Sequence, residues 1–506
     1  MNKFHFLMPL ASCIFPSIQV QAQAEISESQ PLNILFITAD DLNCNSIGAY
    51  GCPVPNITPN VDRLARNGIQ FMNAHVAIAV SQPSRGALAT GRYPHCSGIE
   101  GFYHTNKDIP AIVPTLKEAG YYCGLLGKMD HSSPTADTPW DYKMDWDQLG
   151  WGRDAERYRE EMTRMLEEAK AAKKPFYFMI NSHDPHRPFF GSKGEKNMFK
   201  GEPVPLPSYI YTEDEVNVPG FLCDLPGVRK ELTQYYNCVK RMDDMVGTVL
   251  KVLKDSGQED NTVVMYLSDN GMSQPFSKTN CYYQSTRTPW IVYAPKVFRS
   301  KVVDTEHFIS GIDFFPTVTD ILGIPAPKGV DGRSFKPVLE GKKQDGRTHV
   351  FTEFQSTNGR KAYPMRCVQD KHFAYIFNPW AIDSTAFTNE SLGGMAFNEM
   401  KRYAEKDPVV AERVNMNLYR TLEEFYDIQK DPNALNNLIH HPAYQEEIQK
   451  YRQMMLDQMV KTNDPLKEAM IHRNDLQVVR KTVNKIQQYV IKRHNANVKK
   501  VQPMSR

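Results

Sequence analysis

The chain has little cysteine for its length, and its cysteines are not spaced as zinc ligands. It contains 9 cysteines in 506 residues, with no Cys-x-x-Cys unit among them. This scatter argues against a cysteine-based zinc site and leaves any disulfide pairing unassigned. We expect most of the cysteines that follow residue 24 to be buried thiols. These are Cys44, Cys52, Cys96, Cys123, Cys223, Cys238, Cys281 and Cys367.

The chain also lacks an excess of charge of one sign and lacks internal repeats. Its formal net charge is +2, so no global field attracts it to nucleic acid or to a membrane surface. After residue 24, no segment has the length and apolarity of a membrane-spanning helix. The composition therefore predicts a protein that contacts neither nucleic acid nor the bilayer core, and it leaves the oligomeric state open.

The N-terminus resembles a secretory signal peptide. Lys3 precedes an apolar run from Phe6 to Val20, and small residues follow at Ala22 and Ala24. We expect cleavage near residue 24 and a periplasmic or secreted protein. The segment around Cys13 also resembles a lipoprotein box, but the apolar run continues past it, so lipid anchoring is the less favoured alternative.

Apolar strand-like runs alternate with amphipathic helical segments through most of the chain. This pattern predicts an α/β fold with a large, mostly parallel mixed sheet between helices, over residues 30–344. A helix is expected from Phe308 to Leu322. Antiparallel strands in residues 345–470 predict a smaller C-terminal α+β domain. Residues 471–506 are expected to form a basic amphipathic helix, with an apolar face made by Leu476, Val479, Val483, Ile486 and Val490.

Polar residues follow several of the predicted buried strands. Asp40 and Asp41 follow the run Leu32–Ala39, and Asp269 and Asn270 follow the run Asn261–Leu267. The carboxyl ends of parallel strands meet at one edge of a sheet, where ligands bind in open α/β folds. These four side chains offer only oxygen, which suits Ca²⁺, with Mg²⁺ as the alternative. Lys128 and His183 also follow predicted strands and are expected at the same edge.

The stretch from Ser81 to Arg92 predicts an anion-binding helix. Pro83 suits the first position of a helix, and Gly91 suits its end. Ser81 is therefore expected just before the helix, where free N–H groups favour anions. Arg85 lies one turn further on and can reach back to an oxyanion.

The order Ser-x-Pro-Ser-Arg-x4-Thr-Gly in this stretch resembles the signature of type I sulfatases, of the alkaline-phosphatase-like superfamily. The resemblance implies that Ser81 is converted to formylglycine (3-oxoalanine). One hydroxyl of its hydrate attacks sulfur, and the other later expels sulfate. A serine at this position, where many relatives have cysteine, implies a transient partner: a serine-type formylglycine-generating maturase. The resemblance also implies a sulfated carbohydrate substrate.

The same resemblance implies roles for other residues. Asp40, Asp41, residue 81, Asp269 and Asn270 would hold the cation. Arg85 and Lys128 would stabilise the transition state, and His131 would assist residue 81 as a base. His183 and Lys278 would serve the leaving group. The residues implied in substrate binding or in support of the site are Asp184, His186 and Arg187.

Within the family, the chain resembles the branch of N-sulfoglucosamine sulfohydrolases. The segments His183–Arg187, Ser268–Gly271 and Tyr363–Arg366 carry this resemblance. The chain departs from that branch in having Ser81 for Cys, Lys278 for Arg, and one more residue between Lys128 and His131. Because the last two differences lie on the substrate side, sulfate esters on other sugars stay open.

Two further alternatives remain. An unmodified Ser81 could attack a phosphoester, as in metal-dependent phosphatases of the same superfamily. The chain could also be a binding protein that retains the metal site and holds sulfated glycans without hydrolysing them.

Overall fold

The computed structural model describes Met1 and residues 31–501, so the predicted signal peptide lies, apart from Met1, outside the described residues. The described residues from Leu32 onward form one compact unit. The division of this unit near residues 345 and 471 remains a prediction. Between residues 31 and 501, no helix combines the length and apolarity needed to cross a bilayer.

The main sheet has eight strands, and all neighbours are parallel except at β7, which runs antiparallel to both β6 and β2. This confirms the predicted large, mostly parallel mixed sheet. The strand order is β4 (Tyr142–Met144), β3 (Tyr122–Leu126), β5 (Phe176–Asn181), β1 (Asn33–Ala39), β6 (Thr262–Ser268), β7 (Trp290–Tyr293), β2 (Ile69–His75) and β8 (Val302–Ser310).

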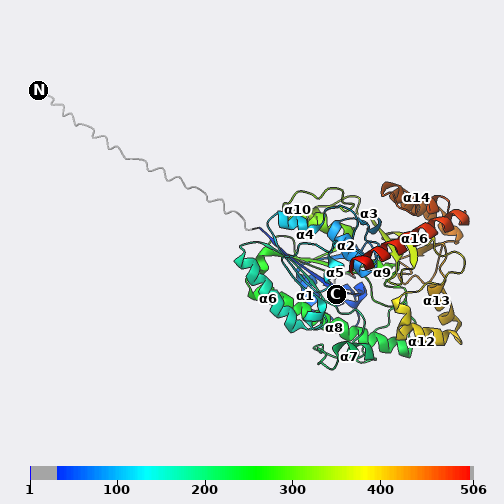
Figure 1. Cartoon of the computed structure of the whole chain (residues 1–506), viewed down its shortest axis with the longest axis horizontal. Helices are drawn as coiled ribbons and strands as arrows, with labels where there is room; N and C mark the ends of the chain where they lie inside the picture. The colour runs from blue at the N-terminus through cyan, green and yellow to red at the C-terminus, as the bar shows by residue number, and fades with distance from the viewer. Residues whose placement is uncertain (2–30, 502–506) are drawn as a thin grey trace. The chain divides into compact units, whose positions relative to one another are not determined.

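Helices cover both faces of this sheet because its central strands are apolar on both sides. In β1, Leu35 and Ile37 join one hydrophobic cluster, whereas Ile34 and Phe36 join another. Two sets of helices pack on the two faces. The first set is α1 (Pro59–Asn67), α6 (Ala155–Ala171) and α8 (Pro226–Asp255), and the second is α4 (Ile112–Glu118), α10 (Phe314–Ile321) and α11 (Lys336–Leu339). Figure 1 shows α4 and α10 on one side of the sheet and α6 and α8 on the other.

A second, four-stranded antiparallel sheet follows in the C-terminal part of the chain, as predicted. Its order is β12 (Glu423–Asp427), β11 (Phe373–Phe377), β10 (Ala362–Asp370) and β9 (His349–Ser356). Its core is shared with α14 (Gln445–Lys461), α15 (Lys467–Ile471) and α16 (Leu476–Val501). Val479, Ile486 and Val490 of α16 are buried in that core, whereas Leu476 is exposed.

One predicted helix was placed wrongly at its start. Phe308 and Ile309 belong to β8 and pair with Asn73 and Ala74 of β2. A capping box between Ser310 and Asp313 then starts the helical turns that lead into α10. The apolar residues of this segment suit a strand as well as a helix, and pairing at the sheet edge decides between them.

The remaining helices of the described residues are short or connect the layers. They are α2 (Ser81–Thr90), α3 (Pro94–Ser97), α5 (Met129–Ser132), α7 (Lys193–Phe199), α9 (Tyr283–Thr286), α12 (Met395–Ala404) and α13 (Pro408–Leu418).

A buried ionic cluster joins α3, the second sheet and the segment after α14. His95 Nδ1 lies 2.5 Å from Glu353 Oε2 and 3.9 Å from Asp464 Oδ2, and Arg366 binds Asp464 at 2.6 Å. Burial alone would lower the pKa of His95, but Glu353 and Asp464 outweigh it and raise that pKa well above its usual value. His95 is therefore a buried cation between two carboxylates.

This cluster predicts that the stability contributed by His95 depends on pH. Because its pKa is higher in the folded than in the unfolded state, the contribution is complete below pH 6.5 and is lost as pH rises through the folded-state pKa. We expect His95→Gln to lower the free energy of unfolding by about 2–4 kcal/mol at pH 6, and by less at pH 9. Denaturant unfolding at both pH values measures this difference. The exposed His440→Gln is the matched control, and an equal loss at both pH values would refute the ion-pair account.

Candidate active site

The predicted polar residues do meet at one edge of the main sheet. Asp40 and Asp41 follow β1, and Asp269 and Asn270 follow β6, its neighbour on one side. His183 follows β5, its neighbour on the other side, and Lys128 follows β3. The parallel order of these four strands therefore brings residues more than 200 positions apart into contact, as the pairing of the Asp41 N–H with Asp269 Oδ1 illustrates.

Three fully buried carboxyl groups form the centre of this edge. Asp40, Asp41 and Asp269 each offer an oxygen, and these oxygens lie within 4.8 Å of one another. Asp41 has a φ of 62°, a left-handed conformation that is uncommon for a residue with a side chain. In this conformation its backbone N–H donates to Asp269 Oδ1 at 3.1 Å. The strained turn thus holds two of the carboxyl groups together.

The electrostatics of this centre favour a bound cation. Burial raises the pKa of Asp41 to about 6, although the positive charge of Lys278 acts in the opposite direction. Burial and the negative charge of Asp40 raise the pKa of Asp269 to about 7. Asn270 Nδ2 donates to Asp41 Oδ1 at 2.8 Å, and Asn270 Oδ1 has no hydrogen-bond partner among the described residues. The cluster is buried, offers only oxygen atoms and includes one acceptor without a partner among the described residues. A bound cation would neutralise its negative charge, and Ca²⁺ or Mg²⁺ suits such ligands.

Ser81 lies directly against the carboxyl groups. Helix α2 begins at Ser81 itself, with Val80 as its N-cap, so the helix starts two residues before the predicted first position at Pro83, whereas Gly91 ends the helix as predicted. Ser81 Oγ donates to Asp40 Oδ1 at 3.1 Å. A nucleophile derived from this side chain would therefore adjoin the candidate metal site.

Arg85 lies one helical turn after Ser81 and is completely buried. Its Nη2 lies 3.0 Å from Asp269 Oδ2, and its Nη1 donates to Thr38 Oγ1 at 2.8 Å and to Asn181 Oδ1. These partners fix the guanidinium between the carboxyl groups and the strand ends. Sequence reasoning placed Arg85 here but did not foresee Thr38 and Asn181, which are ordinary strand residues.

Lys128 and His131 lie on the other side of Asp40. Lys128 has a φ of 54°, and its Nζ contacts Asp40 Oδ2. Burial opposes ionisation of Asp40, but Lys128 and Arg85 hold its pKa well below the usual value. Burial and the charge of Lys128 hold the pKa of His131 well below its usual value, and its Nδ1 has no partner among residues 31–501. The predicted pair is thus brought together despite its longer spacing.

Two imidazole rings complete this side of the centre. His183 Nδ1 lies 3.8 Å from Asp40 Oδ2, and its ring stacks on Trp146 at 5.0 Å between centroids. His186 Nε2 lies 3.7 Å from Asp41 Oδ2. Burial and the charge of Lys128 hold the pKa of His183 well below its usual value. Burial and the charge of Lys278 lower the pKa of His186 to about 3. Both rings are neutral in the free protein.

The charges of Asp184 and Arg187 are paired with other residues of the protein and do not face a substrate position. The Asp184 carboxylate accepts from Arg241 Nε at 2.6 Å and contacts Arg153 Nε at 3.1 Å. Arg187 binds Glu231 Oε1 at 2.6 Å and the Ser273 carbonyl at 3.0 Å. Because their charges are already paired, we infer that both residues position the loop that carries His183 and His186. The prediction that Asp184 or Arg187 contacts substrate gains no support from this geometry.

Lys278 bridges the centre to the C-terminal half of the chain. Its Nζ donates to Asp41 Oδ2 at 2.8 Å and also contacts Glu390 Oε1. Lys278 lowers the pKa of Glu390 to about 2. Sequence reasoning missed Glu390 because it lies in a polar, loop-rich segment and no local pattern distinguishes it. Its side chain is 42% exposed, so it lies at the surface beside Lys278.

Family comparisons agree with this geometry. Residues 32–324, more than half of the chain, match the family described as Sulfatase. Residues 271–390 match the family described as N-sulphoglucosamine sulphohydrolase, C-terminal. The first range contains every residue predicted from sequence for catalysis, metal binding or substrate binding, and the second contains Glu390.

Several curated proteins are similar over most of the chain. N-sulphoglucosamine sulphohydrolase of Homo sapiens is 29% identical, over 87% of this chain and 92% of its own. An ulvan-active sulfatase of Formosa agariphila is also 29% identical, over 88% of this chain and 83% of its own. N-acetylglucosamine-6-O-sulfatase of Bacteroides thetaiotaomicron is 23% identical, over 94% of both chains.

Solved structures share the fold at lower identity. A protein in complex with its substrate D-glucosamine-2-N,6-O-disulfate superposes with a TM-score of 0.65 at 19% identity, covering 86% of this chain and 99% of that chain. The phosphonate monoester hydrolase of Agrobacterium radiobacter gives a TM-score of 0.61 at 17% identity, covering 85% and 96%. These likenesses establish the architecture in which the site is built.

Proposed function

The chain belongs to the sulfatase family, and from this premise we propose that it removes sulfate from a glycosaminoglycan-derived sugar, with N-sulfoglucosamine as the first candidate. The observation that carries the proposal is the contact of Ser81 Oγ with Asp40, inside a centre of three carboxyl groups and three cations. The C-terminal family match and the similarity to human N-sulphoglucosamine sulphohydrolase support this choice of sugar.

A divalent cation would be held by Asp40, Asp41, Asp269, Asn270 and residue 81. The fit rests on the free Asn270 Oδ1 and on carboxyl groups that favour neutralisation. When bound, the cation would neutralise this negative charge and that of the sulfate oxygens, and Ca²⁺ suits the carboxylate-rich set.

Three cations of this chain lie at the carboxyl cluster that Ser81 contacts, and they would orient the substrate. Arg85, Lys128 and Lys278 each pair with one of the three carboxyl groups. Fixed positive charges at these positions would hold a sulfate anion and favour the charge that develops in the transition state. We propose that Ser81 is converted to formylglycine by a serine-type maturase, which would supply a hydroxyl nucleophile once the aldehyde is hydrated. We further propose secretion through the signal peptide of residues 1–24.

His183 is proposed to protonate the leaving group. Its ring is held by stacking on Trp146, beside Asp40. The imidazole is neutral in the free protein, but the negative charge of a bound sulfate would raise its pKa and allow it to carry a proton. His131, which is close to Lys128, is proposed to assist residue 81 as a base.

This role predicts a loss that depends on the leaving group. We expect His183→Ala to lower kcat/KM on a sulfated sugar roughly a hundredfold or more. An aryl sulfate, whose phenolate leaves without a proton, should lose much less. Steady-state rates of both substrates measure the difference, with His186→Ala as the neighbouring comparison. Equal losses of the His183 variant on both substrates would contradict a proton-donating role.

Assays with several substrates distinguish the proposed activity from hydrolysis of sulfate esters or phosphoesters. The relatives include O-sulfatases, and a phosphonate monoester hydrolase shares the fold, which favours sulfate esters and phosphoesters as the competing substrates. We expect release of sulfate from N-sulfoglucosamine to exceed release from glucosamine 6-sulfate. Sulfate release only from the ester would change the assigned substrate. Phosphate release without sulfate release would overturn the proposal, and binding of sulfated glycans without any hydrolysis would favour a binding protein.

A further inference from the structure

Helix α16 carries charge of only one sign. Over Leu476–Val501 it contains no Asp or Glu. The cations among its described side chains are Arg480, Lys481, Lys485, Lys492 and Arg493. A surface helix normally mixes both signs, so this composition indicates a face that meets negative charge.

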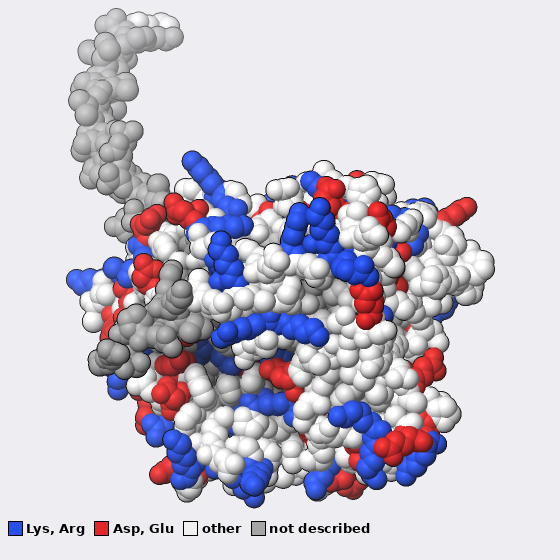
Figure 2. Space-filling view, turned by 45° about the vertical axis from the view of Figure 1, so that its right-hand side comes forward, with Lys and Arg blue, Asp and Glu red and all other residues white. Residues whose placement is uncertain are grey.

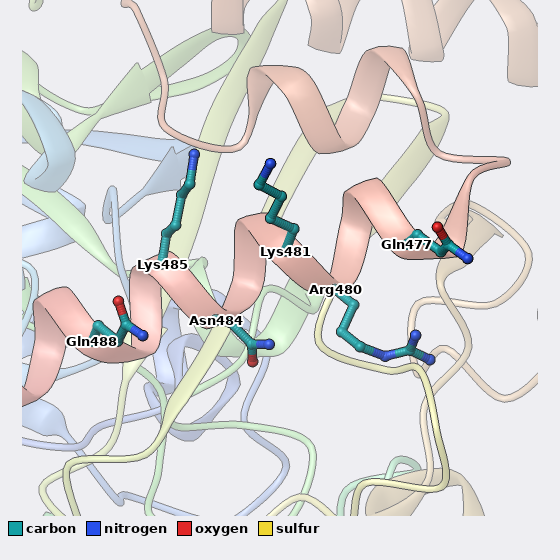
Figure 3. Close-up of a pocket in the computed structure, with 6 residues that line it drawn as sticks. All are labelled: Gln477, Arg480, Lys481, Asn484, Lys485 and Gln488. Atoms are coloured by element: carbon teal, nitrogen blue, oxygen red, sulfur yellow. The ribbon is translucent and has the colours of Figure 1, made fainter.

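The polar side chains of α16 form one continuous exposed stripe. Since Val479, Ile486 and Val490 are buried in the C-terminal core, the opposite face of the helix is open to solvent. Figure 3 shows six of the stripe residues projecting from successive turns. At 1.5 Å per residue the stripe is about 30 Å long, which exceeds a single sugar ring. The α16 stripe consists of Gln477, Arg480, Lys481, Asn484, Lys485, Gln488, Ile491, Lys492, Asn495 and Ala496.

Most of the stripe's charge is unpaired. Arg480 binds Asp383 at 2.6 Å, but Lys481, Lys485 and Lys492 form no ion pair with any residue of the described chain. Four amide side chains alternate with these cations along the stripe, and only Ile491 and Ala496 are apolar. Lysines bind sulfate or carboxylate groups, and amides bind hydroxyl groups, so the stripe matches a sulfated glycan better than an apolar partner.

The face of α16 opposite the stripe contacts a loop beside the active site. Arg493 Nη2 donates to the carbonyls of Gly98 at 3.1 Å and His104 at 2.6 Å, and Asn497 Nδ2 donates to that of Phe102 at 3.3 Å. The Phe102 ring lies 5.6 Å from the ring of His131, the residue beside Lys128. Figure 2 turns the side that carries α16 toward the reader and shows several Lys and Arg side chains gathered beside a hollow.

From these observations we propose that the α16 stripe binds the part of a sulfated glycan that extends beyond the sugar in the active site. The proposal rests on the proposed function, since it assigns an anionic polymer as the substrate. A second copy of this chain is a poorer occupant, because stripe against stripe would oppose like charges. The stripe would therefore add affinity for chains over single sugars, and this affinity would weaken with salt.

The test compares a long and a short substrate. In the full-length protein, Lys481→Gln, Lys485→Gln and Lys492→Gln are combined, because glutamine keeps the helix and removes the charge. We expect KM for a heparin-type octasaccharide to rise roughly tenfold, with kcat unchanged. KM for N-sulfoglucosamine should stay at the value of the unmodified chain. The salt concentration that elutes the protein from immobilised heparin should fall.

The matched control is Lys170→Gln with Lys174→Gln and Lys254→Gln. These exposed lysines lie on or beside α6 and α8, away from α16, and their loss should change neither KM nor elution. Equal effects of the two triple variants, or equal effects on both substrates, would overturn the proposal. So would a stripe variant that changes only the oligomeric state. Elution from immobilised heparin does not depend on catalysis. It therefore tests the stripe even if the substrate assays find no sulfatase activity.

Discussion

Replacing Ser81 by alanine should reduce sulfate release by a factor on the order of 10⁴ or more. Alanine removes the Oγ that contacts Asp40 and leaves no side chain that can be converted to an aldehyde. Initial rates on N-sulfoglucosamine measure the loss. Because Ser81 lies in the first turn of α2 and alanine favours helix, we expect the fold to persist, which thermal unfolding of the variant checks.

Ser97→Ala is the matched control for this substitution. Ser97 is also buried at a helix in the same part of the chain, but its Oγ has only local partners: it donates to the Pro94 carbonyl and accepts from the Ile99 N–H. We expect a change in rate of less than about threefold there. Retention of full activity by Ser81→Ala would exclude both the sulfatase mechanism and the phosphoesterase alternative.

Asp269→Asn should remove the response of the protein to divalent cations. The substitution keeps the size of the side chain but removes one of three clustered carboxylates, which also pairs with Arg85. For the unmodified chain, Ca²⁺ at a hundred times its Kd should stabilise the folded state by about 2.7 kcal/mol and raise Tm. The variant should show no such rise, and its activity should fall about a thousandfold.

Calorimetric or fluorescence melts with Ca²⁺, Mg²⁺ or chelator measure this effect without turnover. Asp383→Asn is the control, because it removes an exposed carboxylate that pairs with Arg480 outside the site. If the unmodified chain has the same Tm with Ca²⁺, with Mg²⁺ and with chelator, the cluster does not bind a divalent cation. A response to Mg²⁺ that exceeds the response to Ca²⁺ would change the assigned ion alone.

The position of the site was predictable because local patterns mark strand ends. A short apolar run followed by Asp40-Asp41, and another followed by Asp269-Asn270, indicate buried strands with polar ends. Parallel strands then place those ends together without any further information. The sulfatase signature added Ser81 and Arg85, and the structure places both against these carboxyl groups. The fold class followed from the same alternation of strands and helices.

Other features depend on tertiary contacts that no local pattern records. Glu390 reaches Lys278 from a short helical turn more than 100 residues later in the chain. Asp184 has the sequence context of a substrate contact, but Arg153 from the turn before α6 and Arg241 from α8 pair with it. Phe308 fits a helix until its pairing with Asn73 is known. In each case a distant partner decides the role of the residue.

The most direct test of the account is the mass of the tryptic peptide that spans Ser81, taken from protein purified out of its native host. We predict the loss of two hydrogens from the serine, or the mass of the corresponding hydrate, as formylglycine requires. An intact serine in fully folded, native protein would contradict the formylglycine mechanism and would make phosphoesters the substrates to test.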